Sequence, residues 1–200
     1  MCLYFWIISM NDFFLLNNES LPHVFIGQNI EIKQIQIKNL NQFAYIADPI
    51  KQLESYSVET IKPIILTSII QIMGLCSLVT SLDPETFSKH FGNQDAIADL
   101  ILKIIQVNED FFKKDKLPKR PTQQKTESAS WFYSFQYLIS CGHRHNDIMN
   151  MSYGAFLKYI EAAQRNERQN IKNTAVAVRM AMNTSKQDWE KSIKQLDKIG

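Results

Sequence analysis

A polar segment at residues 113–128 divides this chain into two parts that can each fold around a core. Its sequence, KKDKLPKRPTQQKTES, has sixteen residues and no aromatic or β-branched aliphatic side chain. Such a segment buries too little apolar surface to fold and is typical of a linker. The sequence therefore predicts an N-terminal domain of residues 1–112, a polar basic linker of residues 113–128 and a C-terminal domain of residues 129–200.

The net charge changes sign across this linker. Residues 1–112 hold 6 Lys and no Arg against 12 acidic residues, a net charge of −6. Residues 113–200 hold 16 Lys and Arg against 8 acidic residues, a net charge of +8. Two parts of opposite charge are expected to present different surfaces to different partners.

The fold class predicted for the whole chain is α+β and predominantly helical. An apolar run at residues 23–26 ends at Gly27, and the segment NIEIKQIQIK (residues 29–38) then alternates isoleucine with polar residues. This pattern predicts a β-hairpin, which helices must cover to make it stable. The alternation slips by one residue at Lys33-Gln34, so a β-bulge is needed to keep all the isoleucines on one face.

Helices are expected to cover this hairpin. Pro49 interrupts the first helical stripe, and residues 58–79 fit one long helix by their length. Asp83-Pro84-Glu85 has the order of an N-cap, a first-turn proline and a first-turn acid. Asp95 is expected to cap the next helix, whose apolar positions run through residues 97–108.

Two apolar stretches raise the question of a membrane. The stretch at residues 63–82 approaches the ~20 residues needed to span a bilayer. It contains Gln71 and five Ser or Thr and has no basic flank, so a buried core helix is favoured. The opening MCLYFWIISM lacks the basic region of a signal peptide, and a start at Met10 and a buried or membrane-touching strand both remain open.

The C-terminal domain is predicted to be all helical. A helix at residues 130–141 is expected to end at Gly142, and a short segment at residues 145–149 follows. Ser152 is a good N-cap for the longest helix of the chain, and Trp189 lies in a last one. We expect the middle of the long helix, residues 164–170, to face solvent because it has no apolar side chain.

Nothing in the sequence predicts catalysis, a cofactor or a metal ion. Nucleophile motifs and phosphate-binding glycine loops are absent from the sequence. The densest group of reactive side chains is CGHRH at residues 141–145, with Asp147 beyond it, and a helix C-cap explains it better than a metal site. Cys2, Cys76 and Cys141 are widely spaced, which favours a reducing compartment over a disulfide framework.

Basic side chains line the long helix of the C-terminal domain and make nucleic-acid binding the runner-up function. Glu161 and Glu167 interrupt this basic face, and no nucleic-acid-binding motif accompanies it, so a contact with an acidic protein or with solvent is favoured. The basic positions are Lys158, Arg165, Arg168, Lys172 and Arg179.

Residues 131–165, WFYSFQYLISCGHRHNDIMNMSYGAFLKYIEAAQR, resemble the C-terminal module of the tail assembly chaperones of long-tailed bacteriophages. A helix in that family precedes a short element, at whose characteristic positions this chain has Asp147-Ile148, Met151-Ser152 and Phe156. A long helix rich in Ala, Arg and Asn follows, as in EAAQRNERQN. The strands upstream resemble the N-terminal module of the family. Residues 113–128 resemble the junction where related phages fuse the modules, often by ribosomal frameshifting, although here both lie in one frame.

This resemblance implies a non-catalytic assembly factor without a small-molecule substrate. Its expected partners are the tape measure protein, a long helical polypeptide, and the tail tube protein, and self-association is left open. It would act in the host cytoplasm and be absent from the mature virion. The partner-contacting residues expected are Tyr153, Phe156, Tyr159 and Ile160, each of which can serve core packing instead.

Overall fold

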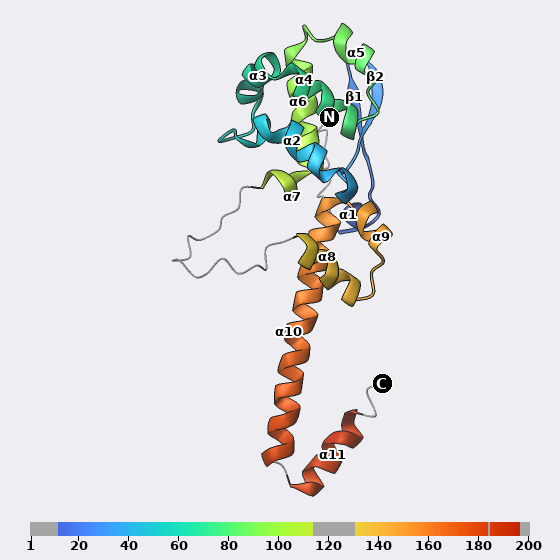
Figure 1. The fold of residues 1–200 in the computed structure, drawn as a ribbon, viewed down its shortest axis with the longest axis vertical. Coiled ribbons are helices and arrows are strands. Elements are labelled where there is room, and N and C mark those ends of the chain that lie inside the picture. The colour runs from blue at the N-terminus through green and yellow to red at the C-terminus, as the bar shows by residue number, and fades with distance from the viewer. Residues whose placement is uncertain (1–11, 114–130, 184, 197–200) are drawn as a thin grey trace, which may run out of the picture. The chain divides into compact units, whose positions relative to one another are not determined.

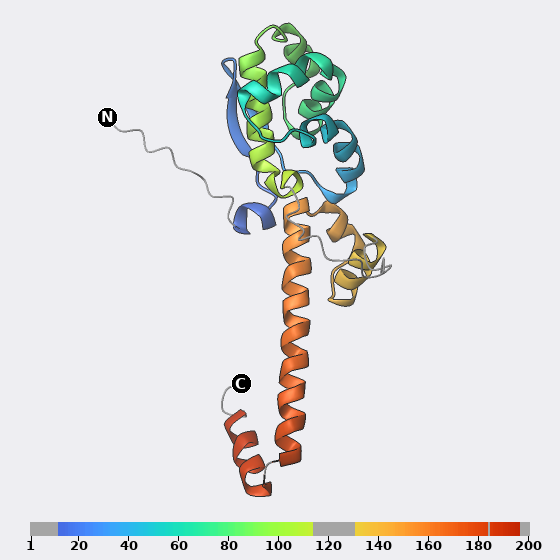
Figure 2. The same cartoon turned by 90° about the vertical axis from the view of Figure 1, so that its left-hand side faces the viewer.

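Helices dominate the computed structural model, which describes residues 12–113, 131–183 and 185–196 (Figure 1, Figure 2). An antiparallel two-stranded hairpin near the N-terminus is accompanied by helices before and after it. The predicted fold class, α+β and predominantly helical, is therefore confirmed.

The hairpin consists of β1 (Leu21–Phe25) and β2 (Gln28–Ile32), with Phe25 opposite Gln28 next to the turn. The two turn residues both have positive φ, 47° at Ile26 and 81° at Gly27. That combination is the type I′ turn, whose twist matches the twist of paired strands and which glycine adopts without strain. The hairpin predicted from Gly27 is thus confirmed.

The slip in the isoleucine alternation marks the end of β2 and not a bulge within it. Beyond Ile32 the chain turns to a new partner, and the backbone N–H of Lys33 donates to the carbonyl of Val79 at 2.7 Å. Gln36 then pairs with Ser152 in an isolated antiparallel bridge. Each pair of isoleucines is therefore buried by a different pairing, and no bulge is needed to bury both pairs.

Eight helices accompany the hairpin in residues 12–113. α6 packs against both strands and against α3, and α2 packs against α4. The buried face of α6 carries four isoleucine or leucine side chains that are fully inaccessible to solvent. The eight helices are α1 (Asp12–Leu16), the 3-10 helix η1 (Ile37–Asn39), α2 (Leu40–Lys51), α3 (Val58–Thr67), α4 (Ile69–Val79), α5 (Pro84–Lys89), α6 (Gln94–Val107) and α7 (Glu109–Phe112).

Two details of these helices correct the sequence predictions. Pro49 lies inside α2 and does not interrupt it, because the buried stripe continues beyond it to the fully buried Ile50. Burial of that stripe outweighs the one hydrogen bond that proline cannot donate. The N-cap of α6 is Asn93, whose side chain accepts from the N–H of Ala96, and not Asp95. The predicted cap at Asp83 is confirmed, since its Oδ1 accepts from Thr86 N–H at 2.8 Å.

The single long helix predicted at residues 58–79 is wrong. α3 and α4 meet at an angle of 110° across Ser68, whose φ of −132° and ψ of 39° lie outside the helical region. A straight helix would have presented one stripe to the core. The bend lets α3 bury Ile61 and Ile65 while α4 buries its own stripe.

The described residues after the linker position form four helices. They are α8 (Trp131–Ser140), α9 (His145–Asn150), α10 (Tyr153–Asn183) and α11 (Lys186–Leu196). Gly142 has a φ of 97°, and the N–H of His143 donates to the carbonyl of Leu138 at 3.1 Å, so α8 ends in a Schellman motif. The helix end predicted at Gly142 is thus confirmed. Ser152 Oγ accepts from Ala155 N–H at 3.2 Å, which confirms the predicted cap of α10.

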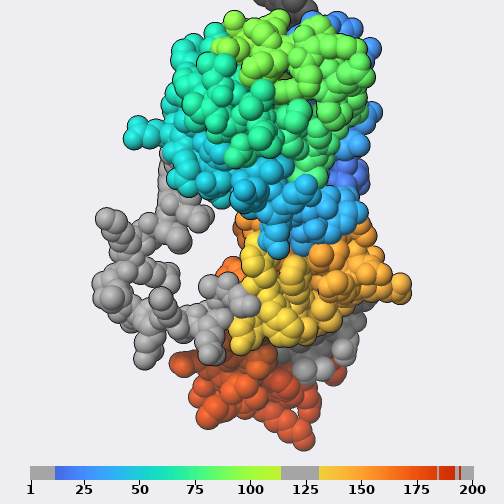
Figure 3. Space-filling model, turned by 45° about the horizontal axis from the view of Figure 1, so that its top comes forward, coloured from blue at the N-terminus to red at the C-terminus, as the bar shows by residue number. Residues whose placement is uncertain are grey.

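The described chain forms two units, Met1–Lys158 and Tyr159–Gly200. The first unit includes α8, α9 and the first turns of α10, and α9 packs against η1. In Figure 3, yellow and orange residues that follow the linker position lie directly against blue residues of the N-terminal part. Apart from Lys113, the predicted linker at residues 113–128 lies outside the described residues. The division into domains of residues 1–112 and 129–200 stays a prediction.

Candidate interaction surface

An aromatic cluster joins α8 to the beginning of α10. The ring of Phe156 lies 5.7 Å, centroid to centroid, from both Trp131 and Phe135, and Trp131 lies 6.3 Å from Tyr153. Tyr153 also meets Phe111 of α7 edge-on, with the centroids 6.1 Å apart. Such contacts add stability beyond the area that the rings bury. The cluster therefore packs α8 and α10 against the helices of the first part of the chain.

The four residues expected to contact a partner have different environments. Phe156 is only 2% exposed and belongs to the aromatic cluster. Tyr153, Tyr159 and Ile160 are half-buried. Phe156 therefore has a packing role, and the binding role of the four residues stays a prediction.

Backbone hydrogen bonds fix the beginning of α10 to the segment that follows β2. The N–H of Ile37 donates to the carbonyl of Met151 at 3.0 Å, and the N–H of Tyr153 donates to the carbonyl of Ile35 at 2.8 Å. Asn108, at the end of α6, supports the same segment, because its Oδ1 accepts from the N–H of Ile35 at 2.7 Å. Residues far apart in the sequence thus form one hydrogen-bonded seam.

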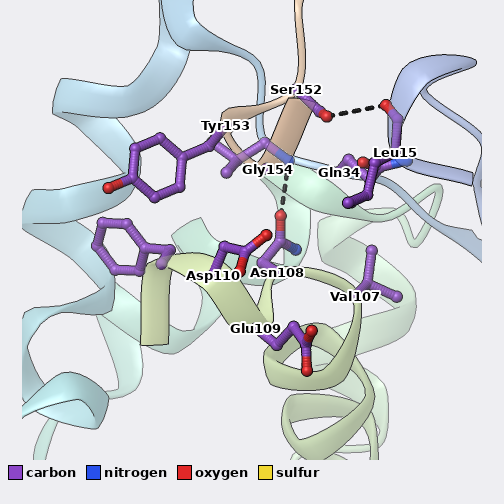
Figure 4. Close-up of a pocket in the computed structure, with 11 residues that line it drawn as sticks. Leu15, Gln34, Val107, Asn108, Glu109, Asp110, Ser152, Tyr153 and Gly154 are labelled. Atoms are coloured by element: carbon purple, nitrogen blue, oxygen red, sulfur yellow. Dashed lines mark hydrogen bonds between the residues drawn. The ribbon is translucent and has the colours of Figure 1, made fainter. Parts of the chain in front are cut away.

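Side chains close around this seam (Figure 4). Ser152 donates to the carbonyl of Leu15 at 3.1 Å, and Gly154 lies against Asp110 and Leu15. A Cβ added at Gly154 would lie 2.8 Å from Asp110 Oδ2 and 2.9 Å from Leu15 Cδ2, so only glycine fits this close approach without a shift.

A small pocket lies inside the seam, lined by Gln34, Asn108 and Ser152 among others. Its volume of about 10 Å³ suits a single water molecule and is far below that of a ligand site. Among the described residues, Gln34 Oε1 is a buried side-chain oxygen without a hydrogen-bond partner. This pocket is polar and structural in character, and too small for an organic substrate.

The reactive side chains lie apart from one another. Cys76 is buried in α4, and burial raises the pKa of its thiol to about 12, so it remains an unreactive thiol at neutral pH. Cys141 is exposed at the turn after α8. Across the described ranges, no three His, Cys, Asp or Glu side chains come together in a group that could hold a metal ion.

The second half of α10 carries an exposed apolar face. Ile171 is 62% exposed, Val178 is 53% exposed and Met182 is 79% exposed. With the exposed Ala175, their spacing of four, three and four residues places them on one side of the helix. We call these four residues the distal stripe. The structure leaves this face open to solvent.

Basic residues lie beside the distal stripe. Arg168, Lys172 and Arg179 are exposed, and each of them lies one to four residues from a member of the stripe. We call these three residues the basic ridge. Arg165, one turn before them, pairs with Glu161 at 3.2 Å. Residues 164–170 are exposed throughout, as the sequence predicted.

Among the described residues, no single helix has the length and hydropathy needed to cross a membrane. The bent pair α3 and α4 meets those criteria only when the two helices are taken together across their 110° bend. The pair buries one side in the core through Ile61, Ile65, Ile72, Leu75, Cys76 and Val79, whereas Leu66, Ile69 and Ile70 are exposed.

A scan against known protein families finds no match, and searches of curated proteins and of solved structures find none either.

Proposed function

We propose that this chain is a non-catalytic tail assembly chaperone of a long-tailed bacteriophage. In this function it binds the tape measure protein, keeps the apolar surface of that long helical polypeptide from aggregating, and helps recruit tail tube subunits. It acts in the host cytoplasm and leaves before the virion is complete. The resemblance of residues 131–165 to the C-terminal module of that family supports this proposal.

The observation that carries the proposal is the apolar surface exposed on α8 and α10. Trp131, Phe132 and Tyr133 are exposed at the start of α8, and the distal stripe is exposed on α10. Contiguous exposed apolar side chains commonly mark a protein interaction surface. An amphipathic helical partner can lay its apolar face against such helices.

A basic nucleic-acid-binding protein is the second candidate, because the basic ridge and Lys158 are exposed on one helix. Phosphate contacts would use those side chains and would weaken steeply with salt. The exposed apolar residues beside the ridge have no role in such contacts. We therefore rank the chaperone function first.

Co-expression with the tape measure protein of the same genome tests the proposal. The chaperone function predicts that the soluble fraction of the tape measure protein rises when this chain is present, and that the two proteins co-purify. An unrelated helical protein of similar size, expressed to the same level, is the control. An unchanged soluble fraction would refute the chaperone function. Salt-sensitive binding of the purified chain to duplex DNA would favour the second candidate.

A further inference from the structure

The second half of α10 combines an apolar stripe with a mainly basic neighbourhood, and Glu167 is an acidic residue one turn before Ile171. Residues 168–187 contain three Lys or Arg on α10 and Lys186 after it, and no Asp or Glu. Within that segment the distal stripe is exposed along its whole length. The surface is therefore both apolar and positively charged.

The two features lie side by side on the helix. Lys172 and Arg179 each follow a stripe residue by one position, Ile171 and Val178, and one position turns an α-helix by about 100°. The basic ridge therefore borders one edge of the distal stripe. Val176 and Met180 are also exposed, but they point away from the stripe, about 140° and 180° around the helix from Ile171.

The charge of this surface selects among possible occupants. Two copies of α10 docked stripe to stripe would bring two basic ridges into one interface, and like charges in an interface are costly. An acidic partner gains from the same ridge. A partner with Asp or Glu beside its own apolar positions matches both features at once.

The shape of the stripe favours a helix as that partner. Ala175 lies within the stripe, and a small side chain lets a second helix approach closely. The stripe contains no aromatic residue or leucine of the kind that inserts into lipid. The spacing of the stripe is that of the anchors by which one amphipathic helix binds another.

We propose that the distal stripe and the basic ridge together dock an amphipathic helix of a partner protein, whose apolar positions are flanked by Asp and Glu. This inference rests on the proposed function and gives the partner segment its chemistry. It also assigns binding to residues 168–182, beyond the cluster around Phe156. The apolar stripe supplies the anchors, and the ridge selects the partner by charge.

Two synthetic helices test this docking on the full-length protein. Both carry leucines at the spacing of the stripe, and one has glutamates on its flanks where its twin has lysines. In fluorescence anisotropy, the glutamate helix is expected to bind at least about tenfold more tightly than its twin. The triple variant R168E/K172E/R179E is expected to reverse this preference.

Apolar variants test the other half of the inference. I171S/V178S/M182S is expected to weaken the binding of the glutamate helix by about tenfold or more, because it removes the apolar anchors. V176S/M180S is the matched control, since it removes exposed apolar side chains from the same helix but off the stripe. This control is expected to bind like the unaltered protein.

Several outcomes would overturn the inference. One is that the two synthetic helices bind equally tightly or not at all. Another is that I171S/V178S/M182S and V176S/M180S lose the same amount of affinity for the glutamate helix. A third is that the protein binds duplex DNA or phosphatidylserine vesicles more tightly than the glutamate helix, with an affinity that I171S/V178S/M182S does not change.

Co-expression separates this inference from the proposed function. If the tape measure protein is solubilised equally by the unaltered chain and by R168E/K172E/R179E, the chaperone function stands and this docking surface is wrong. If the unaltered chain solubilises nothing while the glutamate helix still binds as expected, the surface stands and the chaperone function is wrong.

Discussion

The two ends of α10 differ in what surrounds them. At its beginning, Ser152 and Tyr153 bond to residues from other parts of the chain, and Phe156 is buried. From Ile171 to Asn183 every residue is exposed. One continuous helix thus begins as part of a core and continues as a solvated surface.

This difference shows that apolar periodicity does not by itself identify a core face. The exposed part of α10 is supported locally, by the pair Arg165–Glu161 and by the hydrogen bond from Gln169 to Asn173 at 2.8 Å. Such pairs contribute only a few tenths of a kcal/mol each to a helix. Apolar side chains on this part therefore add little to stability and are available for binding.

Phe156→Ala and Ile171→Ala sharpen the comparison most. Phe156→Ala is expected to lower the free energy of unfolding by about 3 kcal/mol, because it leaves a cavity against Trp131 and Phe135. Ile171→Ala is expected to change it by less than about 0.5 kcal/mol. Urea denaturation followed by circular dichroism measures both. Equal losses would mean that Ile171 is packed in solution, and the contrast between the two ends would fail.

Asn108→Ala tests the seam without touching α10. Asn108 is buried, accepts from the N–H of Ile35 and donates to the carbonyls of Lys33 and Ile104. Its removal leaves buried backbone groups without partners, so we expect a loss of about 2 kcal/mol in the free energy of unfolding. Asn173→Ala, an exposed amide on the solvated part of α10, is the control and is expected to be nearly neutral. If Asn108→Ala left the free energy of unfolding unchanged, water would be replacing the hydrogen bonds of the Asn108 side chain.

Local rules predicted the parts of this fold that depend on neighbouring residues. The hairpin turn at Gly27, the cap at Asp83 and the end of α8 at Gly142 each follow from residues within a few positions. The bend at Ser68 was missed because the core, and not the residue itself, decides it. Asn93 and Asp95 both offer an oxygen, and the sequence pattern does not distinguish which of them caps α6.

The seam could not be predicted from neighbouring residues in the sequence. Gln36 and Ser152 pair across more than a hundred residues, and nothing in either segment identifies its partner. The same limit applies to the candidate surface. The sequence grouped Phe156 with the contact residues by position in a motif, whereas its burial depends on rings contributed by α8.

Ser152→Ala compares two helix caps with different surroundings. Ser152 Oγ accepts from Ala155 N–H and donates to the carbonyl of Leu15, and its side chain is buried. We expect Ser152→Ala to lower the free energy of unfolding by about 1.5 kcal/mol, which is more than the loss of an exposed cap would lower it. Ser185 accepts from Asp188 N–H at 3.3 Å at the exposed start of α11, and Ser185→Ala is expected to cost about 0.5 kcal/mol. Thermal unfolding measures the loss of stability in both variants. Equal losses would mean that the contacts of Ser152 in the seam add nothing beyond an ordinary helix cap.

Two helical glycines give the smallest but most diagnostic effect, because alanine should act on them in opposite directions. Alanine favours a helix over glycine by up to about 1 kcal/mol. At Gly74 in α4, a Cβ would lie 3.7 Å from Ile46 Cγ2, an ordinary contact, so Gly74→Ala is expected to raise the free energy of unfolding by about 0.5 kcal/mol.

At Gly154 the same change forces Leu15 or Asp110 to move, and overpacking of this kind costs about 1–3 kcal/mol. Gly154→Ala is therefore expected to lower the free energy of unfolding by about 1 kcal/mol, despite the gain in helix propensity. Chemical denaturation of the two variants side by side measures the signs. If Gly154→Ala stabilised the protein as Gly74→Ala does, the close approach of α1, α7 and α10 would not persist in solution. The beginning of α10 would then be as loosely held as its exposed end.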